Sequence, residues 1–165
     1  MISPELIAIV AMTENRVIGR SGGMPWHLPA DMFRFKRLSA GKPNIMGRKV
    51  WASLHTQPLP ERQNIVLTRQ PGLVAQGAVV VHTPEEALSA AGDAPEIAII
   101  GGAEIYRLYL EQLTRAELTI IHATLEGDTF MPELPGEWQL TAEKFRPADE
   151  KNKYAMTFQT LVRRA

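Results

Sequence analysis

Short, continuously hydrophobic runs alternate along the chain with segments in which hydrophobic residues recur every three or four positions. Runs of the first kind are typical of strands buried on both faces of a sheet, and they predict strands over 6–12, 43–47, 64–68, 79–82, 96–102 and 117–124. The helical spacing predicts helices over 30–39, 48–54, 83–91 and 103–113. Alternating segments at 138–145 and 154–162 predict a closing antiparallel pair.

This order of elements predicts the fold class. Strands that alternate with helices indicate an α/β fold, with a mostly parallel sheet between two layers of helices. The chain contains no internal repeat or low-complexity linker, so residues 1–165 are expected to form one domain. Ligands of such sheets bind at the carboxyl ends of the strands. The irregular segment 13–29, with three glycines and two prolines, predicts a long loop, and such loops are usually functional or mobile.

The composition narrows the classes of function. Lys plus Arg and Asp plus Glu number 18 each, so the charge balance gives no indication of a nucleic-acid or membrane partner. Cysteine is absent, which excludes disulfides, thiolate catalysis and cysteine metal sites, and is compatible with the cytoplasm. The four histidines are scattered, so no metal site is predicted. The N-terminal segment lacks the features of a secretory leader, and its hydrophobic run is too short for a membrane span.

One acidic residue stands on the hydrophobic side of the helix predicted over 30–39. Helical spacing places Asp31 on one face with Leu28, Phe35 and Leu38. The basic residues of this helix are expected to point elsewhere: Arg34, Lys36 and Arg37. Two interpretations of Asp31 are open. An acid in the first turn can cap the helix and complement its dipole, or it can have a functional role.

Three strand ends carry candidate ligand-binding groups. Gly101 and Gly102 lie where a strand meets a helix, and glycines there allow close approach of a ligand to the backbone, although a tight structural turn explains them equally well. Gly47, Arg48 and Lys49 follow a second strand, and Thr68 and Arg69 close a third. These cations are either solvated surface charges or a phosphate site. If the two arginines converge, they suit a phosphate monoester such as the 2′-phosphate of NADP.

Several motifs, in order, give the chain a close resemblance to a known family. They are IVAM followed after three residues by RVIG, then MPWHLPADMFRFKR, KPNIMGRKVW, PLPERQNIVLT, EIAIIGGAEIY and EGDTFMP. The chain resembles bacterial dihydrofolate reductases of the chromosomal type nearly end to end. The resemblance implies a sheet of about eight strands that ends antiparallel, with four flanking helices. It also implies a monomer that uses NADPH to reduce 7,8-dihydrofolate to tetrahydrofolate for one-carbon metabolism and thymidylate synthesis.

The resemblance assigns the substrate site. Asp31 would hydrogen-bond the 2-amino group and N3 of the pterin, Thr119 would hydrogen-bond Asp31, and Arg62 would bind the α-carboxylate of the glutamate tail. The walls of the pocket would be Ile9, Val10, Leu28, Phe35, Leu54 and Ile100. An acid in such an apolar slot should have a raised pKa, because desolvation disfavours its charged form. Diaminopyrimidine antifolates should pair with it through two hydrogen bonds.

The resemblance also assigns the cofactor site. Gly101 and Gly102 match a glycine pair joined by a cis peptide, and Tyr106 would lie beside the nicotinamide. The long loop with Met24 would close over the nicotinamide, braced by Gly127 and Asp128, and a water near Met24 would protonate N5, which is remote from Asp31. The remaining residues expected to contact NADPH are Ala11, Ile18, Gly19, Gly47, Arg48, Lys49, Val50, Thr68, Arg69, Ile100, Ala103, Glu104 and Ile105.

Departures from the family pattern and two rival functions complete the sequence evidence. Val50 stands where the family usually has a threonine or serine, so we expect weaker cofactor binding by about 1 kcal/mol. His27 replaces the more usual asparagine and is expected at the surface, and Gly22 and Gly23 should make the loop more mobile. The rivals are a pyrimidine reductase of riboflavin biosynthesis, which shares fold and cofactor, and a non-catalytic nucleotide-binding module.

Overall fold

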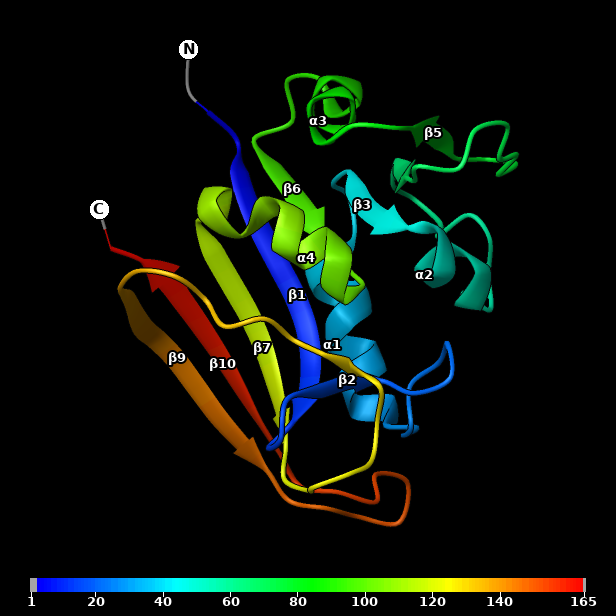
Figure 1. Cartoon of the computed structure of the whole chain (residues 1–165). Coiled ribbons are helices and arrows are strands. Elements are labelled where there is room, and N and C mark those ends of the chain that lie inside the picture. The colour runs from blue at the N-terminus through cyan, green and yellow to red at the C-terminus, as the bar shows by residue number, and fades with distance from the viewer. Residues whose placement is uncertain (1–2, 165) are drawn as a thin grey trace.

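The computed structural model describes residues 3–164; residues 1, 2 and 165, which belong to the predicted domain, lie outside the described part. Eight strands form one sheet in the order β5-β4-β3-β6-β1-β7-β10-β9 (Figure 1). The strands are β1 (Glu5–Thr13), β3 (Asn44–Gly47), β4 (Asn64–Leu67), β5 (Val79–Val81), β6 (Glu96–Ile99), β7 (Arg115–Ile121), β9 (Trp138–Arg146) and β10 (Met156–Arg163). Pairing is parallel from β5 to β7 and antiparallel for β10 and β9, which confirms the predicted α/β fold.

Four helices cover the two faces of the sheet. They are α1 (Pro29–Ser39), α2 (Arg48–Ser53), α3 (Pro84–Ala91) and α4 (Ala103–Tyr109), and all four were predicted. The last predicted helix ends early, because after Tyr109 the chain tightens into a 3₁₀ turn, η1 (Leu110–Gln112). The predicted start of α3 at residue 83 is also confirmed. Thr83 is the N-cap residue, and its side chain accepts a hydrogen bond from the backbone N–H of Glu86.

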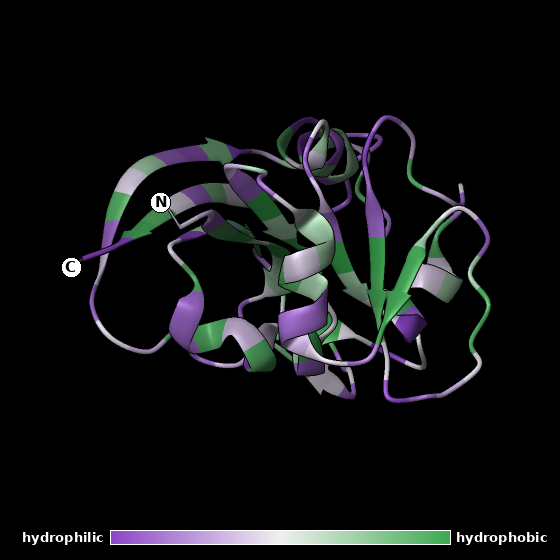
Figure 2. Cartoon of the chain, turned by 90° about the horizontal axis from the view of Figure 1, so that it is seen from above, coloured by the Kyte–Doolittle hydropathy of each residue, from purple (hydrophilic) through white to green (hydrophobic). Residues whose placement is uncertain are grey.

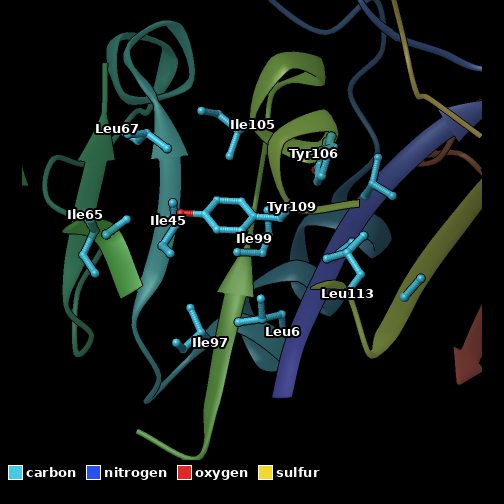
Figure 3. Packing of buried hydrophobic residues seen from close by; sticks show 14 of the residues in the cluster. Leu6, Ile45, Ile65, Leu67, Ile97, Ile99, Ile105, Tyr106, Tyr109 and Leu113 are labelled. Atoms are coloured by element: carbon cyan, nitrogen blue, oxygen red, sulfur yellow. The ribbon is translucent and has the colours of Figure 1, made fainter. Parts of the chain in front are cut away.

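Successive side chains of β1 point to opposite faces of the sheet, and each face packs against its own layer of helices. Leu6 and Ala8 of β1 pack on one face in a cluster with Tyr106 and Tyr109 of α4, together with neighbouring strands (Figure 3). Ile7, the residue between them, packs on the opposite face with α1 and α2. Figure 2 shows the central strands largely hydrophobic, whereas the β9–β10 pair is banded with hydrophilic residues. The β9 strand is mostly exposed, as expected for an edge.

The segment 13–29 is not the simple loop that the sequence predicts. It contains β2 (Val17–Gly19), which pairs antiparallel with β8 (Thr129–Phe130) in a separate two-stranded sheet. Neither strand is long enough to show a periodicity, and only their pairing, across more than a hundred residues, makes them strands. Along 3–164, no helix combines the length and the hydrophobicity needed to cross a membrane.

Candidate active site

A cleft of about 1270 Å³ opens at the carboxyl ends of the parallel strands. It is larger than most sites for one small molecule, so it offers room for two ligands side by side. Every site residue proposed from the sequence lines this cleft: Ile9, Val10, Ala11, Ile18, Gly19, Met24, Leu28, Asp31, Phe35, Gly47, Arg48, Lys49, Val50, Leu54, Arg62, Thr68, Arg69, Ile100, Gly101, Gly102, Ala103, Glu104, Ile105, Tyr106 and Thr119.

Asp31 lies in the first turn of α1 with its carboxylate turned to the sheet. The buried Thr119 hydroxyl on β7 donates a 2.7 Å hydrogen bond to Asp31 Oδ1. Asp31 lies in the first turn of α1, where its charge complements the helix dipole, but among the described residues its carboxylate accepts from Thr119 and from no backbone N–H of α1, so it does not cap the helix. Burial raises the pKa of the Asp31 carboxyl, and the hydrogen bond from Thr119 and the charge of Arg34 offset part of this rise. The site therefore holds one desolvated acid in an apolar slot.

Arg34 corrects a prediction from the sequence. It was expected to point away from the hydrophobic face, but only 8% of its surface is exposed, and it forms an ion pair with Glu117 of β7. The reason is geometric, because Arg34 follows Asp31 by three positions and so lies on the same side of the helix. Lys36 and Arg37 are exposed, as predicted. A cation thus lies behind the acid, between helix and sheet.

Glycines bring the backbone close to the cleft at the ends of β3 and β6. The Gly101–Gly102 peptide is cis, as the resemblance implied, and the backbone N–H of Gly47 donates to the Gly101 carbonyl. Gly101 has a φ of 110°, and a Cβ there would lie 3.1 Å from the ring of Tyr106. The buried Tyr106 hydroxyl donates to the Ile9 carbonyl at 2.7 Å, which fixes the ring against β1. A side chain therefore does not fit at Gly101, whereas a Cβ at Gly102 would meet no atom within 4 Å.

Three cations line the cleft beside these glycines. Arg48 and Lys49 are exposed at the start of α2, and Arg69 follows β4. Arg69 forms an ion pair with Glu104 of α4, so the structure brings both arginines to the cleft with one of them already engaged by a carboxylate. A glycine junction that lines the cleft and is flanked by cations fits an extended, phosphate-bearing cofactor. Val50 is half-buried in the same wall and contributes no polar side-chain atom.

Arg62 also lines the cleft, and it contacts the last residue of α1. Its Nε donates to the Pro60 carbonyl at 2.9 Å, and its Nη1 donates to the Ser39 hydroxyl. Partial burial lowers the pKa of the Arg62 guanidinium, and the charge of Glu61 offsets part of the effect. These contacts hold a half-buried guanidinium in place, which suits a carboxylate ligand.

The second loop contacts the first as predicted. The backbone N–H of Ser21 donates to Asp128 Oδ2 at 2.9 Å, and this bond holds the pKa of Asp128 below its usual range. The backbone N–H of Asp128 donates to the Gly19 carbonyl at 3.1 Å. A Cβ at Gly127 would lie 2.3 Å from Val17 Cγ1, so the loops meet without room for a side chain. Met24, on the first loop, is 57% exposed.

Sequence reasoning missed some of the residues that line the cleft. Trp26 is buried, and its Nε1 has no hydrogen-bond partner within residues 3–164, so a ligand or water at the cleft can accept from it. The PWHLPAD motif contained this residue, but no spacing rule marked it. His82, whose Nδ1 lies 2.8 Å from the Thr68 carbonyl, also lines the cleft. His27 is exposed, as predicted. In the described part of the chain, no three metal-ligating side chains cluster.

Comparisons with known proteins agree with this geometry. Residues 5–163 match the family model for dihydrofolate reductase. The chain is 44% identical to the dihydrofolate reductase of Haemophilus influenzae, covering 94% of this chain and 97% of that protein. It is 42% identical to dihydrofolate reductase type 3 of Salmonella typhimurium, covering 94% and 96%. The structure of dihydrofolate reductase from Enterococcus faecalis complexed with NADP(H) and RAB-propyl superposes with a TM-score of 0.90, at 37% identity and coverage of 98% and 97%.

These matches span both the substrate motif and the glycine pair. They favour a reductase of dihydrofolate over the two rival functions that the sequence left open, the pyrimidine reductase and the inactive nucleotide-binding module.

Proposed function

The chain belongs to the dihydrofolate reductase family, and we propose that its reaction, the NADPH-dependent reduction of 7,8-dihydrofolate to 5,6,7,8-tetrahydrofolate, takes place in this cleft with Asp31 as the anchor of the pterin. The observation that carries the proposal is the Asp31–Thr119 pair at the base of an apolar slot. A flat heterocycle needs apolar walls and a small number of well-placed polar groups.

The substrate half of the cleft is formed by α1 and the strands beneath it. Thr119 occupies one side of Asp31 Oδ1, which leaves the other lone pairs of the carboxylate for the 2-amino group and N3 of the pterin. Arg62 would bind the α-carboxylate of the glutamate tail with its planar fork. Both contacts orient the substrate, and correct orientation increases the reaction rate more than tighter binding alone does.

The cofactor half is formed by the ends of β3, β4 and β6. NADPH, when bound, supplies the hydride for C6 of the pterin. Gly101, Gly102 and Tyr106 would contact its nicotinamide portion, while Arg48, Lys49, Thr68 and Arg69 would hold its phosphates. The close backbone approach at the glycine pair and the cations beside it support this division.

The proton for N5 is not assigned to Asp31, because the carboxylate would bind the pterin at the edge remote from N5. We assign its delivery to a water at the loop that carries Met24, and Asp31 orients and polarises the ring instead. Trp26, with its indole N–H directed to no described protein group, can hold such a water near the substrate.

The proposal extends to the form in which the enzyme works: one domain over residues 1–165, a monomer, cytoplasmic, with small-molecule partners and no nucleic-acid or membrane partner. The equal numbers of acidic and basic residues and the lack of cysteine support it. Size-exclusion chromatography with light scattering tests the monomer directly.

The decisive experiment follows the absorbance of NADPH at about 340 nm in the presence of dihydrofolate, with and without a diaminopyrimidine antifolate. We expect turnover that the antifolate abolishes, because both ligands use the Asp31 pocket. Turnover that the antifolate leaves unchanged would contradict the Asp31 pocket. NADPH binding without turnover would contradict the proposed reaction.

A further inference from the structure

The side chain of Arg34 is buried where the proposed reaction gives it no role. Its guanidinium lies between α1 and the sheet, 5.0 Å from the centre of the Phe158 ring on β10. Nη1 lies 3.3 Å from the Leu118 carbonyl, and Nη2 lies 3.5 Å from the Gln159 carbonyl. Burying a charge is costly, and replacing a buried ion pair by apolar residues often leaves stability unchanged or improves it. Stability alone is therefore a weak reason for this arginine.

Glu117 holds Arg34 in place from behind. Glu117 is 6% exposed, and its Oε1 lies 3.3 Å from Arg34 Nη2 and accepts from the Thr160 hydroxyl. Its Oε2 lies 3.4 Å from Arg115 Nε, so Glu117 has a second cation as a partner. Arg34 thus lies between two carboxylates, Glu117 on one side and Asp31 on the other.

The link from Arg34 to Asp31 runs through one hydroxyl group. Arg34 Nη1 lies 3.4 Å from Thr119 Oγ1, which in turn lies 2.7 Å from Asp31 Oδ1. A guanidinium can only donate, so it faces the oxygen of the hydroxyl, and the single hydroxyl hydrogen is directed to the carboxylate. The guanidinium nitrogen lies no more than about 6 Å from Asp31 Oδ1, within the range where opposite charges favour each other's ionised form.

We propose that Arg34 is a positioning residue for the reaction, which fixes Thr119 as a hydrogen-bond donor to Asp31 and keeps that carboxylate ionised for the pterin. This inference rests on the proposed function, since it gives the pocket acid its orientation and charge. Glu117 contributes by holding Arg34 in place. The orientation and charge of Asp31 are therefore set by protein groups before a ligand binds.

The surroundings of Asp31 support this role for Arg34. Within residues 3–164, Arg34 is the cation whose charge lowers the pKa of Asp31, against the rise caused by burial. From α4, Tyr106 faces the acid as a neutral phenol whose own pKa is raised by burial and by the charge of Asp31. On α1, Arg37 acts on Arg34 by charge repulsion, and the β10 side presents the ring of Phe158.

The test is Arg34→Met, which keeps an unbranched apolar stem against Phe158 and removes the charge. In protein carrying ¹³C at the aspartate carboxyl carbons, the Asp31 signal is identified as the one missing from Asp31→Asn. We expect its titration midpoint to move to higher pH, and the acid limb of the binding curve for a diaminopyrimidine to move with it. At a pH on that limb, binding should weaken about tenfold, while NADPH binding stays unchanged.

Matched variants separate this role from a structural one. Arg37→Met removes an exposed charge three positions further along α1 and should leave the Asp31 titration close to that of the parent. Arg34→Lys should restore most of the midpoint, because it keeps the charge. In the single variant Arg34→Met, Glu117 loses its ion pair with Arg34, and the protein could fail to fold for that reason. Arg34→Met combined with Glu117→Gln removes both buried charges and avoids this problem. The double variant should show the same upward shift of the Asp31 titration midpoint.

An Asp31 midpoint that is the same in the parent, in Arg34→Met and in the double variant would overturn the proposal. Turnover of dihydrofolate by the parent tests the proposed function, whereas the titration tests Arg34 without any turnover. Each can therefore fail alone.

Discussion

Glu104 at the start of α4 forms an ion pair with Arg69 at the end of β4, across the part of the cleft assigned to the cofactor. Both side chains are well exposed, at 86% for Arg69 and 61% for Glu104. Exposed ion pairs contribute little to stability, so a ligand anion can take the place of the carboxylate at low cost. Arg69 is the residue proposed to bind the phosphate, and the carboxylate of Glu104 therefore competes with that phosphate for Arg69.

Removing the cation should change the choice of cofactor. In Arg69→Ala we expect the preference for NADPH over NADH to fall about tenfold, because the arginine contacts the 2′-phosphate that NADH lacks. The measurement is kcat/KM for each cofactor at fixed dihydrofolate. An unchanged preference would remove Arg69 from the 2′-phosphate site.

The partner residue gives the complementary control. Glu104→Gln keeps the shape of the side chain and removes its charge, so Arg69 no longer has an internal anion to release. NADPH should then bind a few-fold more tightly, and more so at low salt, while NADH binding changes less. Tighter binding of both cofactors to the same extent would show that Glu104 acts on a group other than the 2′-phosphate.

The sequence predicted the central sheet because its strands are buried and therefore hydrophobic at nearly every position. The run at 6–12 is such a strand, and its residues alternate between the two helical layers. The β2–β8 pair escaped prediction because it depends on contacts between Val17 and Phe130, far apart in the chain, and not on a local pattern. The end of α4 also depends on its tertiary surroundings, and its last turn is 3₁₀.

The same division holds in the cleft. The residues that the family motifs assign to substrate or cofactor contacts all line it, since motifs record positions whatever their surroundings. Arg34 was misplaced because periodicity assigns a charged residue to solvent unless its partner is known. That partner, Glu117, lies 83 positions further along the chain. The spacing of Asp31 and Arg34 was the available signal, and only the sheet contact gives it meaning.

Val50 offers a gain of binding. It lines the cleft in the first turn of α2, and the family usually has a hydroxyl residue there. Val50→Thr keeps the branched shape and adds a donor, so NADPH should bind about fivefold more tightly, equivalent to about 1 kcal/mol. Fluorescence titration with NADPH measures it, and Val50→Ala, which loses packing without adding a donor, should not tighten binding. Equal affinities of the parent and Val50→Thr would contradict a role for the missing hydroxyl.

The brace between the two loops should support closure over the nicotinamide. Asp128→Ala removes the acceptor for the Ser21 N–H, and we expect turnover to slow about fivefold, because the closed arrangement of the two loops loses this hydrogen bond. Asp128→Asn keeps a side-chain oxygen and should lie between the parent and Asp128→Ala. Thermal unfolding should change little, because the contact is exposed. A large loss of stability with normal turnover would assign the contact to folding instead.

Asp31→Asn should separate activity from stability. Loss of the carboxylate removes the pterin anchor, so turnover near pH 7 should fall by at least about 100-fold while NADPH binding is kept. The stability of the folded protein at neutral pH should rise in this variant, while its turnover falls. Because burial holds the pKa of Asp31 above its ordinary value of about 3.9, the native protein binds more protons than the unfolded chain between those two values.

The sign of the pH dependence follows from that difference in protons. The stability of the parent falls as pH rises from the ordinary pKa through the raised one, and Asp31→Asn lacks this contribution. The variant should therefore be more stable than the parent at neutral pH, with an advantage that shrinks as pH falls toward 4. Urea unfolding of both proteins across this range gives the difference directly, because all other carboxylates titrate in both. Normal turnover by the variant at neutral pH would mean that Asp31 is not the anchor. A variant as stable as the parent at every pH would mean that Asp31 is not a desolvated acid.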